Sequence, residues 1–437
     1  MDADTIFALA SAPGRAGIAV VRLSGLRTRD AITALGCDVP QPRKAVRAKF
    51  TNPATRELLD DGLLILFPAP HSFTGEDVAE LHLHGGRAVV ESVLDALSRI
   101  DGLRPAEPGE FSRRAFANDK MDLTEAEAIA DLVDAETRAQ QRQALRQMGG
   151  ALKELYDGWR HRLVQALAHL EAVIDFPDED LPADVLERLW GEVADLCAAI
   201  MRHLDDGRRG ERIRSGISIA IVGPPNAGKS SLINMLSRRE TAIVSAAPGT
   251  TRDVIEVHLD LDGHAVLVAD TAGLRESSDS IESEGIRRAR SRAEAADLKI
   301  AVFDGATYPA LDAATKALVD DNTIAVVNKS DLLKSQPREM LAMSLQSGAG
   351  VDQFLRRLHA AVNALADTGA AMPLTRVRHR KALEECLAAL QRGRAASDSE
   401  LAAEDLRLAA RALGRLTGRI DVEEILDAVF RDFCIGK

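Results

Sequence analysis

The 437-residue chain is predicted to be a multidomain protein of mixed α+β and α/β class. Three observations predict this. Short apolar runs broken by turn residues fill the first part of the chain, apolar positions then recur with a helical period, and a block with strand and helix signals interrupts that period. We therefore expect a small α+β domain at 1–118, a discontinuous helical domain at 119–212 and 369–437, and an inserted α/β domain at 213–368.

The amino-terminal domain carries strand signals. Ile18-Ala-Val-Val-Arg22 and Gly62-Leu-Leu-Ile-Leu-Phe67 are apolar runs bounded by Gly and Pro, which is typical of strands. Residues 89–97 have the spacing of an amphipathic helix. These patterns predict a small domain that combines strands with at least one helix.

From Leu123 the apolar period changes to that of a helix, and such stripes run to about residue 206 and again from about 374 to 430. Thr124 and Glu127 predict a capping box at the first of these helices. Because each apolar stripe must be buried against a partner, we expect the two helical blocks to pack on each other, with the α/β segment inserted between them.

Composition indicates a globular protein of a reducing compartment. The net charge of −12 argues against broad nonspecific nucleic-acid binding, which depends on neutralising phosphates. Four cysteines without CxxC spacing give no support for a zinc site or a reactive dithiol. The start Met1-Asp-Ala-Asp4 is acidic, unlike a signal peptide, and no apolar stretch approaches the ~18 residues of a membrane span. We expect a soluble cytoplasmic protein without membrane contact.

The segment Gly223-Pro-Pro-Asn-Ala-Gly-Lys-Ser230 matches the pattern G-x-x-x-x-G-K-S/T between a predicted strand, 217–222, and a predicted helix, 231–236. In that context backbone N–H groups surround a phosphate, Lys229 neutralises the outer phosphates and the Ser230 hydroxyl can ligand Mg²⁺. The residues expected to contact the nucleotide here are Asn226, Ala227, Gly228, Lys229, Ser230 and Ser231.

Two further motifs follow in the order that a GTPase needs. Asp270-Thr-Ala-Gly273 follows a predicted strand, so that its Asp can hold Mg²⁺ through water and its Gly lets the backbone approach the γ-phosphate. The Asp of Asn328-Lys-Ser-Asp331 can accept two hydrogen bonds from guanine, which adenine cannot donate. Together the motifs predict GTP over ATP and a Ras-like P-loop GTPase domain. The nucleotide-contacting residues expected from these motifs are Asp270, Thr271, Ala272, Gly273, Asn328, Lys329 and Asp331.

Two more segments complete the expected nucleotide site. Ser344-Leu-Gln346 stands where GTPases usually carry a Ser-Ala-Lys-like turn against the base, so Ser344 is expected to contact the nucleotide. In Gly249-Thr-Thr-Arg-Asp253, Thr250 and Thr251 are placed like switch I hydroxyls, and one of them is expected to complete the Mg²⁺ shell. A polar loop is the alternative interpretation of that segment.

Hydrolysis needs a water-orienting group other than the Ras-type glutamine, because Leu274 follows Asp-x-x-Gly and cannot hydrogen-bond water. The acidic stretch 276–284 supplies the candidates Glu276, Asp279, Glu282 and Glu284. Charge compensation can come from Arg252 or Arg275 in cis, or from a monovalent cation held by the Asn226 amide oxygen.

Blocks at both ends of the chain resemble a known family. With the nucleotide motifs, Pro108-Gly-Glu-Phe-Ser112 and the terminal Cys434-Ile-Gly-Lys437 resemble the MnmE (TrmE) family of tRNA uridine-modification GTPases. The resemblance runs end to end. Its other blocks are Ser72-Phe-Thr-Gly-Glu-Asp77, His84-Gly-Gly86, Asn118-Asp-Lys120, Ala128-Ile-Ala-Asp-Leu132 and Ile174-Asp-Phe-Pro-Asp178.

The resemblance implies a homodimer whose GTP hydrolysis is stimulated by K⁺ when two GTPase domains meet. It implies that Glu282 activates the attacking water and that Ser230 and Thr251 ligand Mg²⁺. The implied K⁺ ligands are Asn226, Ser245, Ala247 and Thr250. This agrees with the deduction that Leu274 cannot orient water, and it favours K⁺ over an arginine finger.

The resemblance also implies that the amino-terminal domain binds a tetrahydrofolate, in the 5-formyl or 5,10-methylene form, through Arg22, Glu80, Lys120 and Lys437. Glu80 can pair with the amino and imino edge of the pterin, and Lys120 or Arg22 can meet the glutamyl carboxylates. Without the resemblance, the sequence would indicate only that Arg22 is a charged residue at the edge of a strand and that Lys120 is a solvated charged residue.

Two short patterns leave alternatives open. His82 and His84 alternate on a predicted strand, and without an evident third ligand they favour packing or a wall of the folate pocket over zinc. Cys434 is either a nucleophilic thiol or a packed inert one, and Gly436 and Lys437 fit a prenylation box poorly.

The function implied by the resemblance is modification of tRNA together with a flavin-dependent partner, MnmG (GidA). The pair would add an aminomethyl or carboxymethylaminomethyl group to C5 of the wobble uridine. The folate would supply the carbon, the flavin the redox step and GTP hydrolysis a conformational cycle. The alternative is a regulatory GTPase switch that assembles ribosomes or another complex without nucleoside chemistry. A pure folate aminomethyltransferase conflicts with the intact nucleotide motifs.

Overall fold

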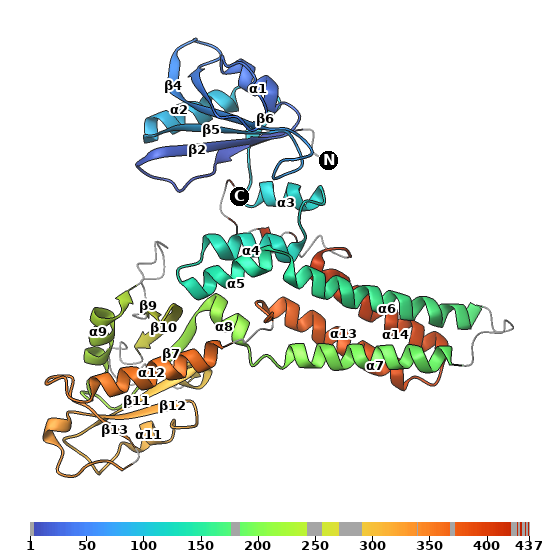
Figure 1. The fold of residues 1–437 in the computed structure, drawn as a ribbon. Coiled ribbons are helices and arrows are strands. Elements are labelled where there is room, and N and C mark those ends of the chain that lie inside the picture. The colour runs from blue at the N-terminus through green and yellow to red at the C-terminus, as the bar shows by residue number, and fades with distance from the viewer. Residues whose placement is uncertain are drawn as a thin grey trace, which may run out of the picture. The chain divides into compact units, whose positions relative to one another are not determined.

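The computed structural model describes residues 4–175, 184–242, 256–270, 291–338, 340–367 and 372–420, together with Leu426, Val429, Phe430, Phe433 and Gly436. The chain folds into two compact units, which are described separately (Figure 1). Unit 1 consists of Met1–Ala130, Lys153–Arg160 and Leu413–Lys437, and unit 2 consists of Asp131–Leu152 and His161–Ala412. The domain boundaries expected from the sequence remain a prediction.

Unit 1 is built on a six-stranded sheet with the order β3-β4-β5-β2-β1-β6 (Figure 1). Neighbouring strands are antiparallel except β1 and β6, which are parallel. The strands are β1 (Thr5–Leu9), β2 (Ala16–Ser24), β3 (Val46–Thr51), β4 (Leu58–Phe67), β5 (Val78–Gly85) and β6 (Leu103–Pro105). The runs at 18–22 and 62–67 lie inside β2 and β4, so these strand predictions are confirmed.

Two helices, α1 (Thr28–Ala34) and α2 (Arg87–Ser98), bury their apolar sides against one face of this sheet. Ile32 of α1 and Val93 of α2 join Leu23 of β2 in one core, and all three are at most 1% exposed. Because side chains alternate along a strand, the residues between the core positions point to the opposite face of the sheet.

Helix α3 (Glu110–Ala117) follows the sheet, and α4 (Leu123–Val133) comes after it. Asp122 caps α4, because its Oδ1 accepts from the Glu125 N–H at 2.8 Å while Glu125 Oε2 accepts from the Asp122 N–H at 2.8 Å. The predicted capping box at Thr124 and Glu127 is therefore wrong by two residues. Thr124 already lies inside the helix and donates its hydroxyl to Asp122 at 2.8 Å.

Unit 2 contains a seven-stranded sheet with the order β13-β12-β11-β7-β10-β9-β8. The strands from β13 to β10 are parallel, and β9 and β8 continue the sheet in antiparallel pairing. The strands are β7 (Ile217–Val222), β8 (Thr241–Ala242), β9 (Glu256–Leu261), β10 (His264–Asp270), β11 (Leu298–Asp304), β12 (Thr323–Asn328) and β13 (Leu341–Ala342). The predicted strands at 217–222, 264–269 and 323–327 are thus confirmed.

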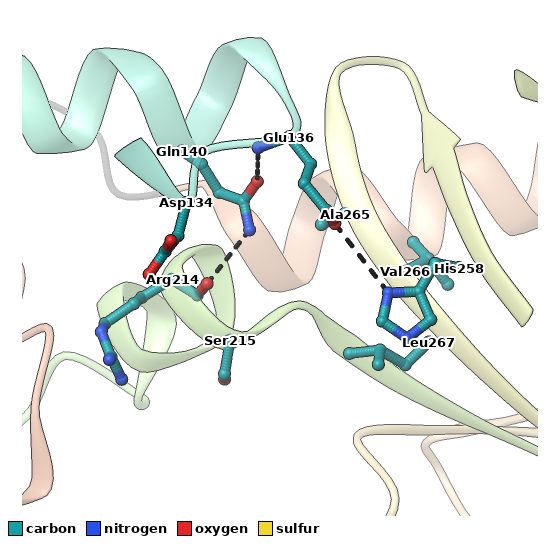
Figure 2. A pocket seen from close by; sticks show the side chains of 9 residues that line it. All are labelled: Asp134, Glu136, Gln140, Arg214, Ser215, His258, Ala265, Val266 and Leu267. Carbon is teal, nitrogen blue, oxygen red and sulfur yellow. Dashed lines mark hydrogen bonds and ion pairs between the residues drawn. The ribbon is translucent and has the colours of Figure 1, made fainter. Parts of the chain in front are cut away.

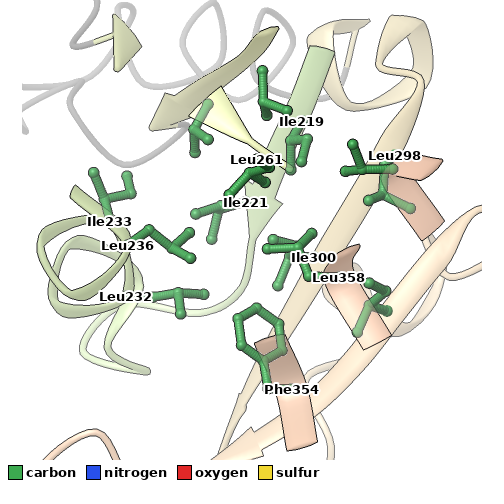
Figure 3. Packing of buried hydrophobic residues seen from close by; sticks show 14 of the residues in the cluster. Ile219, Ile221, Leu232, Ile233, Leu236, Leu261, Leu298, Ile300, Phe354 and Leu358 are labelled. Carbon is green, nitrogen blue, oxygen red and sulfur yellow. The ribbon is translucent and has the colours of Figure 1, made fainter. Parts of the chain in front are cut away.

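Helices α9 (Lys229–Arg239) and α12 (Val351–Ala366) pack on one face of this sheet (Figure 3). Ile221 of β7, Leu232 of α9 and Phe354 of α12 meet there, each with 0% exposure. The residues that alternate with Ile221 join a second core on the other face. Since β7 is buried on both sides, its sequence is a continuous apolar run. The parallel strands place their carboxyl ends at one edge of the sheet, where loops can bind a ligand.

Further helices lie in the described part of the chain from residue 138 onward. They are α5 (Arg138–Met148), α6 (Ala151–Asp175), α7 (Val185–Leu204), α8 (Arg209–Ser215), α11 (Ala313–Lys316), the 3₁₀ helix η1 (Ser330–Leu332), α13 (Val377–Ala395) and α14 (Ser399–Thr417). α7 precedes the α/β segment and α13 follows it, and these two helices pack against each other as the apolar stripes predict. The sequence did not predict α8. Arg380 of α13 forms an ion pair with Glu211 of α8 at 2.9 Å and another with Asp206, which precedes α8, at 2.7 Å.

Candidate functional site

The predicted phosphate loop connects the carboxyl end of β7 to the first turn of α9. Gly228 at the N-cap of α9 has a φ of +103°, and a Cβ atom there would lie 2.2 Å from the side-chain nitrogen of Asn328. Only glycine fits this close approach. Asn226 is exposed in the same loop, and Ala227 is fully buried beneath it.

The side chain of Lys229 is hydrogen-bonded to the start of the phosphate loop. Its side chain is buried, and Nζ donates to the carbonyl oxygens of Gly223 at 2.8 Å and Pro224 at 2.9 Å. Ser230 and Ser231 are exposed in the first turn of α9, where the direction of the backbone N–H groups and the helix dipole favour an anion. The role of Ser230 as a Mg²⁺ ligand remains a prediction.

Asn328 joins three parts of the candidate nucleotide site. It is the last residue of β12 and is 3% exposed. Its Nδ2 donates to the Ala227 carbonyl of the phosphate loop at 2.8 Å, and its Oδ1 accepts from the Leu345 N–H at 3.2 Å. The motif that was predicted to recognise guanine therefore also fixes the phosphate loop and the turn at 344–346.

The residues after Asn328 lie at the same edge of the sheet. Lys329 has a left-handed φ of +60° and pairs with Asp304 at 2.6 Å, while Asp331 is exposed. Ser344 is fully buried and its Oγ accepts from the Ser347 N–H at 3.2 Å, so its hydroxyl shapes the turn. The exposed Asp331 carboxylate is thus the acidic group of this motif that can meet a base.

Asp270 is the last residue of β10, and its backbone pairs with Ile221 near the end of β7. This register places the start of the Asp-x-x-Gly motif next to the phosphate loop, as expected for a shared Mg²⁺ site. The other predicted residues of the switch segments and of the hydrolytic site lie outside the described residues: Ser245, Ala247, Thr250, Thr251, Thr271, Ala272, Gly273 and Glu282. Their roles remain predictions.

Arg22 and Glu80 meet on the face of the unit 1 sheet that lies opposite α1 and α2. They are direct partners across β2 and β5, and the guanidinium donates to Glu80 Oε1 at 2.8 and 3.2 Å. Each side chain keeps about a fifth of its surface exposed, at 20% and 19%. The Arg22 guanidinium carbon lies 5.5 Å from the ring centroid of Phe73 and 5.9 Å from that of Phe111. A charged pair beside aromatic rings can bind a flat heterocycle that carries N–H donors.

Lys120 is exposed on a segment that the structure ties to the Ser72–Asp77 block. Asn118 Nδ2 donates to the Thr74 carbonyl at 2.7 Å, and a Cβ atom on Gly75 would lie 3.0 Å from Lys120 Cε. Lys120 therefore lies next to the loop that supplies Phe73 to Arg22.

The tail reaches the same sheet through Gly436. A Cβ atom on Gly436 would lie 2.3 Å from the carbonyl oxygen of Leu9, whose strand partner is Val21 beside Arg22. Cys434 and Lys437 lie outside the described residues, so the implied roles of both remain predictions.

The two histidines of β5 have acidic neighbours. His84 Nδ1 lies 2.8 Å from Asp60 Oδ1, and His82 Nε2 lies 3.4 Å from Glu80 Oε2. Within the described ranges, no group of three or more His, Cys, Asp or Glu residues is placed to hold a metal ion. His82 therefore belongs to the neighbourhood of the Arg22–Glu80 pair.

Three residues of these sites were missed in the sequence. Phe73 and Phe111 were part of the recognised blocks, but nothing in those blocks said that their rings would lie beside Arg22. Asp304 ends a strand without belonging to a motif, and its contact with Lys329 depends on the pairing of β11 with β12. A polar residue at the carboxyl end of a parallel strand was the available signal.

A cavity of about 180 Å³ lies elsewhere in unit 2, between the start of α5 and the β9–β10 hairpin (Figure 2). Gln140 of α5 donates to the Arg214 carbonyl at 3.1 Å, and Glu136 faces His258 at 3.9 Å across it. A neighbouring cavity of about 330 Å³ shares Gln140 and Arg214. None of the predicted nucleotide or folate residues lines either cavity, so neither is the candidate site.

Among the helices of the described residues, none combines the length and the hydropathy that crossing a membrane requires.

A family model of the GTP-binding protein TrmE N-terminus matches residues 5–120, and a model of the MnmE helical domain matches residues 123–434.

Curated relatives match the chain over nearly its whole length. The tRNA modification GTPase MnmE of Paramagnetospirillum magneticum is 60% identical over 99% of this chain and 100% of its own. A mitochondrial 5-taurinomethyluridine tRNA synthase subunit of Danio rerio is 47% identical over 99% of this chain and 93% of its own. Among solved structures, the G domain of the FeoB iron transporter of T. maritima is 23% identical over 35% of this chain and 99% of its own, with a TM-score of 0.26. The matches to the family models and to full-length relatives show that this chain belongs to the MnmE family of tRNA modification GTPases.

Proposed function

We propose that this chain modifies C5 of the wobble uridine of tRNA together with a flavin-dependent MnmG (GidA) partner, adding an aminomethyl or carboxymethylaminomethyl group. Family membership establishes a GTPase of tRNA modification that uses GTP and Mg²⁺. The zebrafish relative is named for a taurinomethyl product, so the group added at C5 is a point that the experiment must test. We further propose that the protein acts in the cytoplasm.

The observation that carries the proposal is the Arg22–Glu80 pair. Both side chains are partly exposed on one sheet face, with the Phe73 ring 5.5 Å from the guanidinium carbon. A pterin ring that lies against this face can stack on an aromatic side chain and donate two N–H bonds to the Glu80 carboxylate. Lys120 or Arg22 would meet the glutamyl carboxylates, and Lys437 would complete the site. A tetrahydrofolate bound in this way would supply the one-carbon unit.

The same proposal includes hydrolysis driven by K⁺ in a homodimer. Asn226 supports it, because this residue is exposed in the phosphate loop with a left-handed φ of +62°. Its amide oxygen is then available to a cation beside the phosphates, with Ser245, Ala247 and Thr250 as further ligands. Glu282 would activate the water, and Ser230 and Thr251 would hold Mg²⁺.

The test of the folate site compares Glu80→Gln with Glu91→Gln in a deletion strain. Glu91 pairs with Arg87 on the exposed side of α2 at 2.7 Å and serves as a matched control. Glu80→Gln should abolish tetrahydrofolate binding in calorimetry and wobble modification in nucleoside mass spectrometry, while GTP hydrolysis continues. Glu91→Gln should change none of these. Unaltered folate binding by Glu80→Gln would remove the folate proposal. If deletion of the protein leaves the wobble nucleosides unchanged, the regulatory switch is the correct function.

The hydrolytic proposal has its own test. Glu282→Ala should abolish GTP hydrolysis while leaving nucleotide affinity nearly intact, because water activation acts after binding. The rate should also be higher in K⁺ than in Na⁺ buffer. Undiminished turnover of the variant would remove the role of Glu282, and equal rates in the two salts would remove the role of K⁺.

A further inference from the structure

Asp304 lies at the edge of the candidate guanine site without belonging to any of the nucleotide motifs. It is the last residue of β11 and pairs in register with Asn328, the last residue of β12. Its Oδ2 accepts from Lys329 Nζ at 2.6 Å. The Asp304 side chain is 15% exposed and that of Lys329 is 33% exposed, so the pair is largely shielded from solvent.

The Asp304 carboxylate is itself fixed in place. Its second oxygen, Oδ1, accepts from the Ala306 N–H at 2.9 Å. The next residue, Gly305, donates its N–H to the Asn328 carbonyl at 2.8 Å, and a Cβ atom there would lie 2.6 Å from the carbonyl oxygens of Asn328 and Lys329. The 304–306 turn is therefore built directly against the backbone of the guanine motif.

Lys329 cannot reorient easily under these constraints. Asn328 anchors its backbone on one side through two side-chain hydrogen bonds, and η1 begins on the other side. The lysine stem runs from the end of β12 to the end of β11, where Asp304 holds the ammonium. A lysine stem fixed in this way offers an apolar strip against which a flat purine can lie.

We propose that Asp304 is a positioning residue for guanine recognition. Its carboxylate holds Lys329 so that the lysine stem is a preformed wall of the base site, next to the Asp331 carboxylate that accepts from the guanine edge. Because the wall is fixed before GTP arrives, binding does not bear the cost of ordering a long side chain.

The unit 2 sheet supplies a matched control. Lys299 at the other end of β11 pairs with Asp320 at 2.5 Å, with side chains 8% and 54% exposed. This pair also joins a lysine to an aspartate and has one member on β11, but it lies at the opposite end of that strand from the phosphate loop. A loss of general sheet stability should therefore appear in both variants, and a loss of base recognition only at Asp304.

The experiment uses the full-length chain and measures the dissociation constants of GTP and of inorganic triphosphate by calorimetry with Mg²⁺. Asp304→Asn keeps an oxygen for the Ala306 N–H but loses the charge that holds Lys329. We expect it to weaken GTP roughly five- to twentyfold, as charge-assisted pairs of this kind do, and to leave inorganic triphosphate within about twofold. Asp320→Asn should alter neither constant. Both ligands are measured on one preparation, so their ratio does not depend on the folded fraction.

A second variant tests whether Asp304 acts through Lys329. Lys329→Met keeps an apolar stem but removes the ammonium that Asp304 holds. In that background Asp304→Asn should weaken GTP by less than about twofold, because coupled residues are not additive. Full additivity of the two substitutions would overturn the proposal. So would equal weakening of GTP and triphosphate by Asp304→Asn, or equal effects of Asp304→Asn and Asp320→Asn.

Discussion

Replacing Asn328 with alanine should uncouple the phosphate loop from the base-binding turn. The side chain donates to the Ala227 carbonyl at 2.8 Å and accepts from the Leu345 N–H at 3.2 Å. Ala227 is 0% exposed, so water cannot easily replace the lost donor. Loss of the hydrogen bond from the Leu345 N–H costs about 1 kcal/mol, and the buried Ala227 carbonyl left unsatisfied costs about 1–3 kcal/mol. The total is about 2–4 kcal/mol, so GTP affinity should fall by roughly 30- to 1000-fold if all of it appears in binding.

Two measurements check this expectation. Titration with a fluorescent guanine nucleotide gives the dissociation constant. Hydrogen–deuterium exchange reports the local change, since the Leu345 amide should exchange about fivefold faster once its acceptor is removed, for a loss of about 1 kcal/mol. Asn322→Ala is the control, because Asn322 is exposed just before the other end of β12. A variant Asn328→Ala that binds GTP as tightly as the unchanged protein and protects Leu345 equally would refute the reasoning.

Three other predictions follow from the described contacts. Burial alone raises the pKa of Glu110, but hydrogen bonds from Arg104, the Glu107 N–H and Arg114 outweigh it and leave that pKa below the ordinary 4.5. The ionised Glu110 carboxylate therefore stabilises the folded state fully above about pH 4.5, and this stabilisation is lost as the pH falls through the lowered pKa of the folded state. The free energy of unfolding of Glu110→Gln, measured at acid pH, should therefore depend less on pH than that of the unchanged protein. Arg380→Met leaves Asp206 and Glu211 without their shared cation and should cost about 2–4 kcal/mol in thermal unfolding, whereas Arg407→Met, at an exposed pair with Glu171, should change little. Burial, with Cys197 nearby, raises the pKa of the fully buried Cys386 thiol. Cys386 should therefore react with a disulfide reagent only when the protein unfolds. Labelling of Cys386 in the folded protein as fast as that of an exposed thiol would contradict this prediction.

Local sequence patterns were enough for the elements that carry the nucleotide site. Ile217–Val222 is a continuous apolar run because β7 is buried on both faces, and its bounds agree with the structure. The spacing of the phosphate loop follows from the same local physics, since only glycine can stand at position 228. Capping was harder to predict, because Asp122 and Thr124 both suit an N-cap and only the actual start of α4 distinguishes them.

The pairing of distant residues was beyond sequence reasoning without the family resemblance. Arg22 and Glu80 are 58 residues apart and meet because β2 and β5 are neighbours in the sheet. Glu80 stands on a strand whose alternation predicts a face, but strand order decides which residues share that face. The resemblance named both residues, and the structure brought them within 2.8 Å of each other.

The sequence by itself determined the local elements and the class of nucleotide, because both depend on residue types at short, fixed spacings. Only the tertiary structure decided that Asn328 holds the phosphate loop, that Asp304 holds Lys329 and that aromatic rings lie beside Arg22. These contacts depend on strand order and register, which are set by the burial of whole sheet faces rather than by any short stretch of sequence.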